Sequence, residues 1–258
     1  MRIAVYSDVH GNLTALQAVL ADIKKQAPDL IAFAGDLCMV GARPKACLEL
    51  AKAETDIFIY GNTDEYIYTP QHVPQDASET QRQRLGMFNE LANWTNGQLG
   101  KQNVDWLKRL PFSHRISPTA VSSDDLLVVH ANPQDVTRGI TPTAEFQQEV
   151  LGKVRWPQSD EDLRTLLENV TAGIIAYGHF HIPNVRQWGN ITLANISSVN
   201  LPSDGDNRAK YGLLTWDKAT GWTVEKRLVA YNLRQERELI SFIKPPSWQW
   251  LLEQMPKV

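Results

Sequence analysis

The sequence predicts an α/β protein in which two β-sheets pack face to face with helices on the outside. Two observations support this fold class. The first sixty residues alternate short apolar strands with helical segments, which is typical of a buried, largely parallel sheet. The C-terminal third instead has the pattern of β-hairpins, which indicates antiparallel strands. Both kinds of segment together favour a layered sandwich, and a length of 258 residues suits a single domain spanning residues 1–258.

The N-terminal part has a predicted βαβαβ order. Strands are expected at Ile3–Tyr6, Leu30–Ala34 and Ile57–Tyr60, because each is a short apolar run. Between the first two strands, apolar residues at helical spacing predict a helix that ends before Pro28: Leu13, Leu16, Val19, Leu20 and Ile23. A shorter helix is expected around Pro44–Lys52, since proline is favoured in the first helical turn.

The middle of the chain is predicted to hold two helical regions and two strands. Residues 66–110 are rich in Gln, Asn and Arg and carry periodic apolar side chains. We therefore expect a helical insertion of two or three helices on the sheet edge that carries Asn62. A second helical region is expected at residues 143–168. The apolar runs Leu126–Val129 and Ile174–Tyr177 have the length of strands.

The C-terminal segment, residues 184–258, is predicted to form hairpins followed by a short tail helix. The hairpin strands are expected at Val185–Trp188 and Ile191–Ile196, then at Tyr211–Trp216 and Trp222–Tyr231. Gly189-Asn190 is a favoured tight turn between the first two strands. The tail helix is expected at Trp248–Met255, after a pair of prolines.

Composition narrows the class of protein. Lys and Arg number 26 against 29 Asp and Glu, so no basic excess indicates nonspecific nucleic-acid binding. The two cysteines, Cys38 and Cys47, are too few for a disulfide framework and are expected to be buried thiols. The start of the sequence lacks a signal-peptide pattern, and no apolar run approaches the ~18–20 residues of a membrane span. These features predict a soluble, cytoplasmic protein without a membrane partner, and they leave its oligomeric state open.

Polar residues follow five of the predicted strands in short motifs. The motifs are Asp8-Val9-His10, Gly35-Asp36, Gly61-Asn62, His130 and Gly178-His179-Phe180-His181. Because the ends of parallel strands meet at one edge of a sheet, these side chains should converge. Side chains alternate in an extended segment, so Asp8 and His10 should point the same way, as should His179 and His181. Carboxylate, imidazole and amide ligands without thiolate suit Mn, Fe, Co, Ni or Zn.

This arrangement resembles the calcineurin-like metallophosphoesterase superfamily, whose signature runs Asp-x-His, Gly-Asp, Gly-Asn-x-Asp/Glu, His and Gly-His-x-His. The segments Ser7–Leu13, Val129–Pro133 and Asp204–Asp206 are similar to the small bacterial phosphodiesterase branch. The resemblance implies a four-layer αββα sandwich with two mixed sheets. It also implies a pair of divalent cations, with Mn²⁺ the expected ion and Fe, Zn, Co or Ni as alternatives.

The resemblance assigns a role to each matching residue. Asp8, His10 and His181 would hold one cation, Asn62, His130 and His179 the other, and Asp36 would bridge them. Asp36, Asn62 and His130 would also take part in catalysis. The implied reaction is phosphoester hydrolysis by a metal-bound hydroxide, so no Ser or Cys nucleophile is required.

The sequence departs from the family pattern at the residue after Asn62. Many members have His there as a general acid or phosphate contact, whereas this chain has Thr63. A hydroxyl can bind a phosphoryl oxygen but cannot donate its proton near neutral pH, so phosphodiesters or monoesters with good leaving groups are the expected substrates. Arg138 is the arginine expected to bind the phosphate, with Arg82 and Arg84 as weaker candidates. Further departures concern residues 195–199, where the family usually has Asn-Pro-Gly-Ser-Val; Ser198 is a weak candidate for a phosphate contact.

Three functions are compatible with these motifs. The first is a dimetal phosphoesterase acting on small phosphoesters. The second is a hydrolase committed to nucleotides, such as dinucleoside polyphosphates or cyclic nucleotides, with base recognition by the insertion. The third is a non-catalytic scaffold, as in a retromer subunit that is similar to this family but has a damaged metal site; seven intact ligands argue against it. A Rossmann-type nucleotide-binding module is excluded because no Gly-x-Gly-x-x-Gly follows the first strand.

Overall fold

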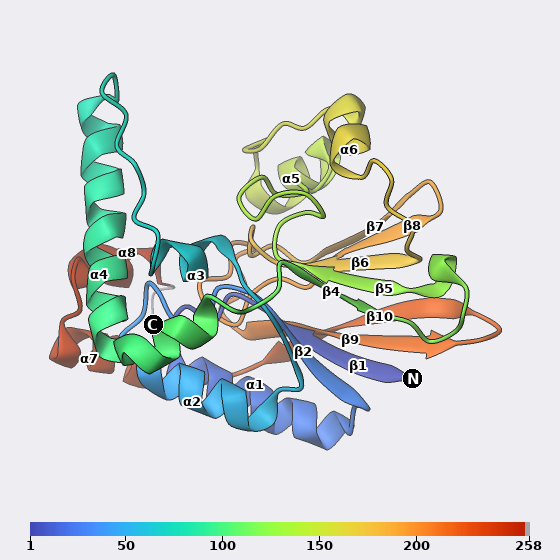
Figure 1. Ribbon diagram of the computed structural model, residues 1–258, viewed down its shortest axis with the longest axis horizontal. Coiled ribbons are helices and arrows are strands. Elements are labelled where there is room, and N and C mark those ends of the chain that lie inside the picture. The colour runs from blue at the N-terminus through green and yellow to red at the C-terminus, as the bar shows by residue number, and fades with distance from the viewer. Residues whose placement is uncertain (256–258) are drawn as a thin grey trace.

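Two five-stranded mixed sheets form the centre of the protein, and the computed structural model describes residues 1–255 (Figure 1). In order, the first sheet contains β10 (Gly221–Val229), β9 (Ala209–Asp217), β1 (Arg2–Tyr6), β2 (Leu30–Ala34) and β3 (Ile57–Ile59). Strands β1, β2 and β3 are parallel, and β9 pairs antiparallel with both β1 and β10. The predicted parallel start and antiparallel end of the chain therefore share one sheet.

The second sheet is built from the middle of the chain. In order, it contains β4 (Ser113–Ile116), β5 (Leu126–Val129), β6 (Ile174–Tyr177), β8 (Ile191–Asn195) and β7 (Asn184–Trp188). Strands β5, β6 and β8 are parallel, whereas β4 and β7 run antiparallel at the two edges. The parallel strands of both sheets therefore carry the predicted polar motifs at their carboxyl ends.

Helices cover the outer faces of the two sheets, which confirms the predicted four-layer α/β sandwich. On the first sheet lie α1 (Leu13–Gln26) and α2 (Pro44–Glu54), and on the side of the second lie α5 (Ala144–Leu151) and α6 (Asp160–Leu166) (Figure 1). Helix α7 (Leu233–Ile243) packs against α1, and α8 (Trp248–Gln254) packs against α7. Side chains of β1 alternate: Ile3 and Val5 pack between the sheets, while Ala4 and Tyr6 pack against the helices. A 3₁₀ turn at Ser122–Asp124 precedes β5.

The insertion is helical, and its helices fall within the expected two or three, since the short helix α3 (Asn62–Tyr66) is followed by an α4 (Glu79–Leu107) that is kinked into two parts. Residues 67–78 connect α3 to α4 without a helix. A single residue, Gly100, interrupts α4 with a positive φ of 72°. The N-terminal half of α4 projects away from the sheets (Figure 1). Among the described residues, no helix is both long and apolar enough to cross a membrane.

The helix α7 is absent from the sequence-based prediction, which placed only hairpins and a tail helix in this part of the chain. It is anchored by Glu236, whose carboxylate is buried and pairs with the guanidinium of Arg43 at the start of α2. The hydroxyl of Thr14 on α1 donates to the same carboxylate at 2.7 Å. One buried charge cluster thus ties three helices together on the outside of the first sheet.

Candidate metal centre

Loops at the carboxyl ends of five parallel strands bring all seven predicted metal-binding residues together. Strands β1, β2 and β3 of the first sheet are followed by four of them, Asp8, His10, Asp36 and Asn62, and β5 and β6 of the second sheet by the other three, His130, His179 and His181. The donor atoms of Asp8, Asp36 and His130 all lie within 4.8 Å of one another. The site therefore sits where the edges of the two sheets meet.

Three donors form a first group around Asp8. Nε2 of His181 lies 3.1 Å from Oδ1 of Asp8 and 3.3 Å from Nε2 of His10. Nε2 of His10 lies 3.7 Å from the same carboxylate oxygen. These three atoms form a compact triangle.

A second triangle lies beside the first. Oδ1 of Asn62 lies 3.0 Å from Nε2 of His130 and 3.1 Å from Nδ1 of His179, and the two ring nitrogens are 3.3 Å apart. Oδ2 of Asp36 lies between the triangles, 3.7 Å from Nε2 of His10 and 3.5 Å from Nε2 of His130. One carboxylate oxygen thus reaches both groups of donors.

The spacing of these atoms fits coordination of cations. Two donors that each lie about 2.1 Å from one cation are about 3.0 Å apart at 90° and about 3.4 Å apart at the tetrahedral angle. The donor pairs within the two triangles span 3.0 to 3.7 Å, which covers these values. The oxygen and nitrogen donors, with no sulfur among them, suit Mn, Fe, Co, Ni or Zn.

Backbone carbonyls orient three of the four imidazoles. Nδ1 of His10 lies 3.1 Å from the carbonyl of Met39, Nδ1 of His130 lies 2.9 Å from that of Ala34, and Nδ1 of His181 lies 2.8 Å from that of Leu201. A carbonyl only accepts hydrogen bonds, so each Nδ1 carries the proton and donates it. The lone pair of each Nε2 then faces the other donors, which is the tautomer that a metal ligand requires.

The two carboxylates are held in the same way. Oδ2 of Asp8 accepts the backbone N–H of His179 at 3.0 Å, and Oδ1 of Asp36 accepts the backbone N–H of Thr63 at 2.9 Å. In each case the second oxygen faces the imidazoles. The loop of one motif therefore fixes the carboxylate of another, which is why the motifs depend on one another.

Asp64 is a residue of the site that the sequence reasoning did not assign. Its buried carboxylate accepts three backbone N–H groups, from Asp36 at 2.7 Å, Leu37 at 2.9 Å and Gly61 at 3.0 Å. It lies two residues after Asn62, in the acidic position of the Gly-Asn-x-Asp/Glu motif, which is the signal that could have identified it. Asp64 fixes the loop that carries Asp36 against the loop that carries Asn62.

The backbone geometry of the motifs corrects the prediction of extended segments. Asp8 and His10 have φ angles of 55° and 45°, and His179 and His181 have φ angles of 71° and 59°. All four, together with Asp36 at 66°, are in the left-handed region rather than in an extended conformation. The side chains converge as predicted, but tight turns aim them, not the alternation of a strand. Such strain is common where the surrounding structure holds a functional site.

Two glycines of the motifs allow loops to approach the carboxylates closely. A Cβ on Gly61 would lie 2.2 Å from Oδ1 of Asp36, and a Cβ on Gly178 would lie 2.2 Å from Oδ2 of Asp8. Any larger residue would push the carboxylate out of place. The glycine that precedes Asn62 and the one that precedes His179 are therefore part of the positioning of the donors.

The charges within the site favour anionic carboxylates. Burial opposes ionisation of Asp36, but the imidazoles of His130 and His10 outweigh it and lower the pKa to about 2. Burial also opposes a charge on His130, yet Asp36 and Asp8 raise its pKa to about 10. Burial, with the neighbouring His130, lowers the pKa of His179 to about 4. The two buried carboxylates thus attract positive charge, which the proton of His130 supplies and which a bound cation would supply in its place.

The predicted substrate contacts are only partly brought to this site. Thr63 lines a groove that opens from the donors, and its buried hydroxyl has no hydrogen-bond partner among the described residues. Arg138 does not line this groove; its guanidinium instead pairs with Asp162 at 2.7 Å. Of the two other arginine candidates, Arg84 does line it and Arg82 does not. Ser198 is fully buried and lies outside the groove lining.

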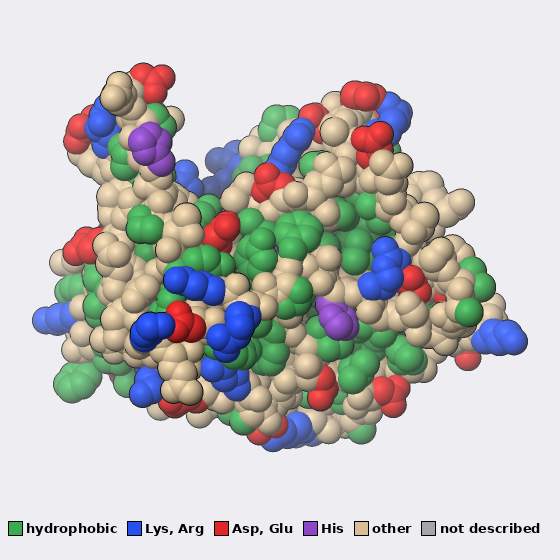
Figure 2. Space-filling view, viewed as in Figure 1, with side chains coloured by type: hydrophobic (Ala, Val, Ile, Leu, Met, Phe, Trp, Pro, Cys, Tyr) green, Lys and Arg blue, Asp and Glu red, His purple; other side chains and the backbone are tan. Residues whose placement is uncertain are grey.

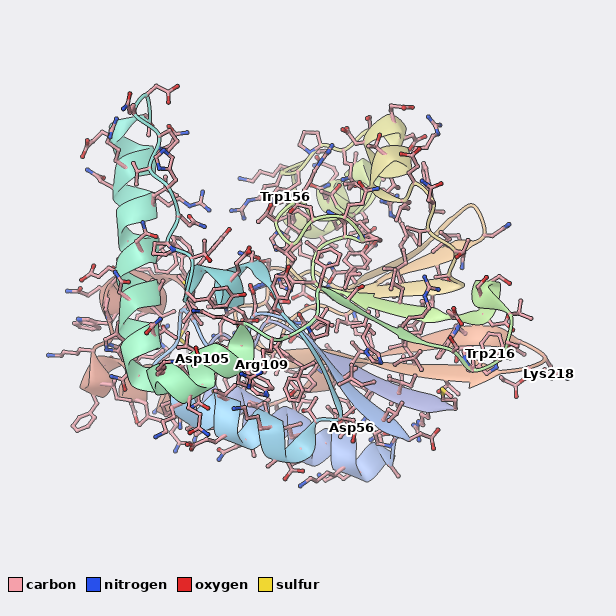
Figure 3. All side chains as sticks on the ribbon, viewed as in Figure 1. Asp56, Asp105, Arg109, Trp156, Trp216 and Lys218 are labelled. Carbon is pink, nitrogen blue, oxygen red and sulfur yellow. The ribbon has the colours of Figure 1, made fainter. Side chains whose placement is uncertain are left out.

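The remaining candidates do not contribute donors. His72 is exposed and His114 lies on β4, and neither belongs to the two triangles. Cys38 and Cys47 are buried free thiols, as predicted. One tryptophan, Trp156, supports the site indirectly: its ring packs against that of Phe180, between the two histidines of the last motif, with ring centres 4.8 Å apart (Figure 3).

Comparison with known proteins shows what the whole chain is similar to. The chain is 26% identical to an uncharacterized protein of Methanocaldococcus jannaschii, over 95% of this chain and 94% of that protein. Its fold is similar to the crystal structure of a metallophosphoesterase from Sphaerobacter thermophilus, with a TM-score of 0.69, 23% identity and coverage of 98% and 97% of the two chains. A hypothetical protein from Pyrococcus horikoshii OT3 gives a TM-score of 0.73, 18% identity and coverage of 98% and 96%.

A family profile provides the assignment. The profile of the calcineurin-like phosphoesterase superfamily domain matches residues 1–219, which include all seven donors and nine of the ten strands. The chain belongs to the calcineurin-like phosphoesterase superfamily.

Proposed function

We propose that this protein is a phosphoesterase that requires two divalent cations and hydrolyses phosphodiesters, or monoesters with good leaving groups. The observation that carries this proposal is the pair of donor triangles with Asp36 between them. Membership of the phosphoesterase superfamily supports it. Two bound cations would supply an activated water and neutralise the charge of the phosphoryl group.

The residues of the first triangle, Asp8, His10 and His181, would hold one cation. Asn62, His130 and His179 would hold the other, and Asp36 would contact both. Mn²⁺ is the proposed ion, because it accepts mixed carboxylate, imidazole and amide ligands. The carbonyl partners of the imidazoles and the N–H partners of the carboxylates preorganise these donors before any cation binds.

The groove lining supports substrates with good leaving groups. Its titratable residues, within the described part of the chain, are three histidines of the donor set, Asp36, Tyr66 and Arg84. Burial raises the pKa of the Tyr66 phenol, and an arginine stays charged, so neither group gives up a proton readily near neutral pH. A leaving group that needs no protonation is then the favoured one. The free hydroxyl of Thr63 would donate a hydrogen bond to a phosphoryl oxygen.

The test compares two aryl esters with and without metal. Protein stripped by a chelator and reloaded with Mn²⁺ is assayed on bis-p-nitrophenyl phosphate and on p-nitrophenyl phosphate. We expect metal-dependent hydrolysis that Asp36→Asn abolishes. The matched control is Asp56→Asn, because Asp56 precedes β3 at the opposite end of the sheet and accepts one backbone N–H, from Ile31 at 2.9 Å (Figure 3).

Two outcomes would contradict the proposal. If Asp36→Asn turned over the esters about as fast as the unmodified protein, Asp36 would not be the residue that contacts both cations. Tight Mn²⁺ binding by calorimetry without hydrolysis of either ester would instead favour the non-catalytic scaffold. Metal binding can also be measured without turnover, as a rise in the free energy of unfolding. A ligand present at 100 times its dissociation constant raises that free energy by about 2.7 kcal/mol.

A further inference from the structure

A groove of about 640 Å³ begins at the donor triangles and continues toward the projecting half of α4. This volume is in the usual range of ligand sites and far exceeds what a phosphate ion needs. Six of the residues beyond the donors define what we call the outer groove: Tyr66, Gln81, Arg84, Leu85, Phe88 and Trp250. In the space-filling view, the end of α4 and the α5–α6 region form two lobes with a hollow between them (Figure 2).

One face of α4 lines the outer groove. Gln81, Arg84, Leu85 and Phe88 are spaced three, one and three residues apart, so they share a side of the helix. This half of the helix is the part that stands away from the sheets, and Leu85 and Phe88 remain half-buried there. The insertion therefore presents an apolar and cationic face to the groove.

Aromatic rings form the wall of the outer groove. Phe88 and Trp250, from α4 and α8, make an edge-to-face contact with ring centres 6.1 Å apart and planes at 67°. Tyr66 lies at the end of α3, one helical turn after Asn62, and so connects this wall to the donors. Aromatic side chains of this kind bind planar rings by stacking.

Among the described residues that line the groove, Arg84 is the one lysine or arginine. Its guanidinium carbon lies 5.9 Å from the centre of the Phe88 ring. Within residues 1–255 no carboxylate forms an ion pair with it, in contrast to Arg138, which pairs with Asp162. A guanidinium that is free of acidic partners and lies in a groove suits a second anion.

We propose that the outer groove binds the organic part of the substrate, and that this part combines a planar aromatic ring with an anionic group beyond the scissile phosphate. That is the chemistry of a nucleoside polyphosphate or of a phosphodiester-linked dinucleotide. The ring lies against Phe88 and Trp250, and the second anion pairs with Arg84. This inference rests on the proposed function, because the scissile phosphate is placed at the donors.

The test measures binding of ADP, which carries a base and two phosphates, to the protein loaded with Mn²⁺. Isothermal titration calorimetry gives dissociation constants for ADP, AMP and inorganic phosphate. In Arg84→Ala we expect ADP to bind about tenfold more weakly or worse, since a charge-assisted bidentate pair is lost, while inorganic phosphate loses much less. Phe88→Ala should weaken ADP and AMP together, because both carry the base.

Arg109→Ala is the matched control. Arg109 is exposed just after α4, makes no ion pair within residues 1–255, and does not line the groove (Figure 3). Its loss should leave ADP affinity unchanged. Equal affinity of ADP in Arg84→Ala and Arg109→Ala, or equal losses for ADP and inorganic phosphate, would overturn the assignment of the outer groove.

The experiment also separates this inference from the proposed function. Hydrolysis of the aryl esters together with ADP binding that does not depend on Arg84 would overturn the outer groove alone. ADP binding that depends on Arg84, in a protein that hydrolyses no ester, would support the outer groove as a nucleotide site and overturn the catalytic proposal.

Discussion

The backbone N–H of Thr63 donates to Oδ1 of Asp36 at 2.9 Å, and this hydrogen bond turns Oδ2 of Asp36 toward both groups of donors. The link is made by the main chain, so it persists with any residue other than proline at position 63. Position 63 can therefore vary in the chemistry that it offers to a substrate without disturbing the carboxylate between the two triangles.

Thr63→Ala is expected to lower turnover only modestly, within about tenfold, because it removes one hydroxyl contact and keeps the backbone N–H. His130→Ala should abolish metal-dependent turnover, since it removes a donor and leaves the buried Asp36 with His10 as its remaining imidazole neighbour. Steady-state kinetics on bis-p-nitrophenyl phosphate compare the two variants. Losses of equal size would show that the hydroxyl is as important as the imidazole.

Asp64→Asn is expected to weaken Mn²⁺ binding by about 10–100-fold, the usual effect of changing a group that orients metal ligands. An amide offers one oxygen where the carboxylate accepts three backbone N–H groups with two oxygens. Asp29→Asn is the control, because Asp29 also accepts a backbone N–H, from Arg2, far from the donors. Metal titration measures both; unchanged affinity in Asp64→Asn would contradict a positioning role.

Gly178→Ala is expected to reduce metal affinity about tenfold or more, because the added methyl group would lie 2.2 Å from Oδ2 of Asp8 and displace it. The same change at Gly97, inside α4, meets no atom within 4 Å. Gly97→Ala should therefore leave metal affinity alone and stabilise the fold by about 0.5–1 kcal/mol through helix propensity. Calorimetry and urea unfolding provide the two readouts. A Gly178→Ala protein with intact metal affinity would refute the close approach.

Arg43→Ala is expected to lower the free energy of unfolding by about 3 kcal/mol, because it leaves the buried carboxylate of Glu236 without its cation. Lys24→Ala breaks the pair with Glu54 between more exposed groups and should cost less than about 1 kcal/mol. Urea denaturation distinguishes the two. Similar losses would mean that the Arg43–Glu236 pair is no stronger than a surface pair.

Much of the strand content and the convergence of the site could be predicted from the sequence. Leu30–Ala34, Leu126–Val129 and Ile174–Tyr177 match β2, β5 and β6 without any shift. These strands are buried on both faces, so their sequences are short, continuous apolar runs with clear ends. Since the motifs follow such strands directly, their meeting at one edge follows from the parallel pairing.

Other elements are absent from the prediction, for reasons that differ from one to the next. The sequence of α7 is amphipathic and does indicate a helix, and only the buried charge of Glu236 departs from that pattern. Strand β4, Ser113–Ile116, is a polar edge strand without clear alternation. The left-handed turns at Asp8, His10 and Asp36 cannot be read from residue type alone, because hydrogen bonds from other loops hold them.

The division of the donors between the two sheets has a consequence for how the protein would acquire the proposed cations. Four side chains arrive from the sheet of β1 and three from the sheet of β5, and neither set alone surrounds an ion. High affinity must therefore appear only after the inner faces of the sheets have docked. Titration with an ion during refolding would thus report on the docking of the two sheets, not on the formation of either sheet.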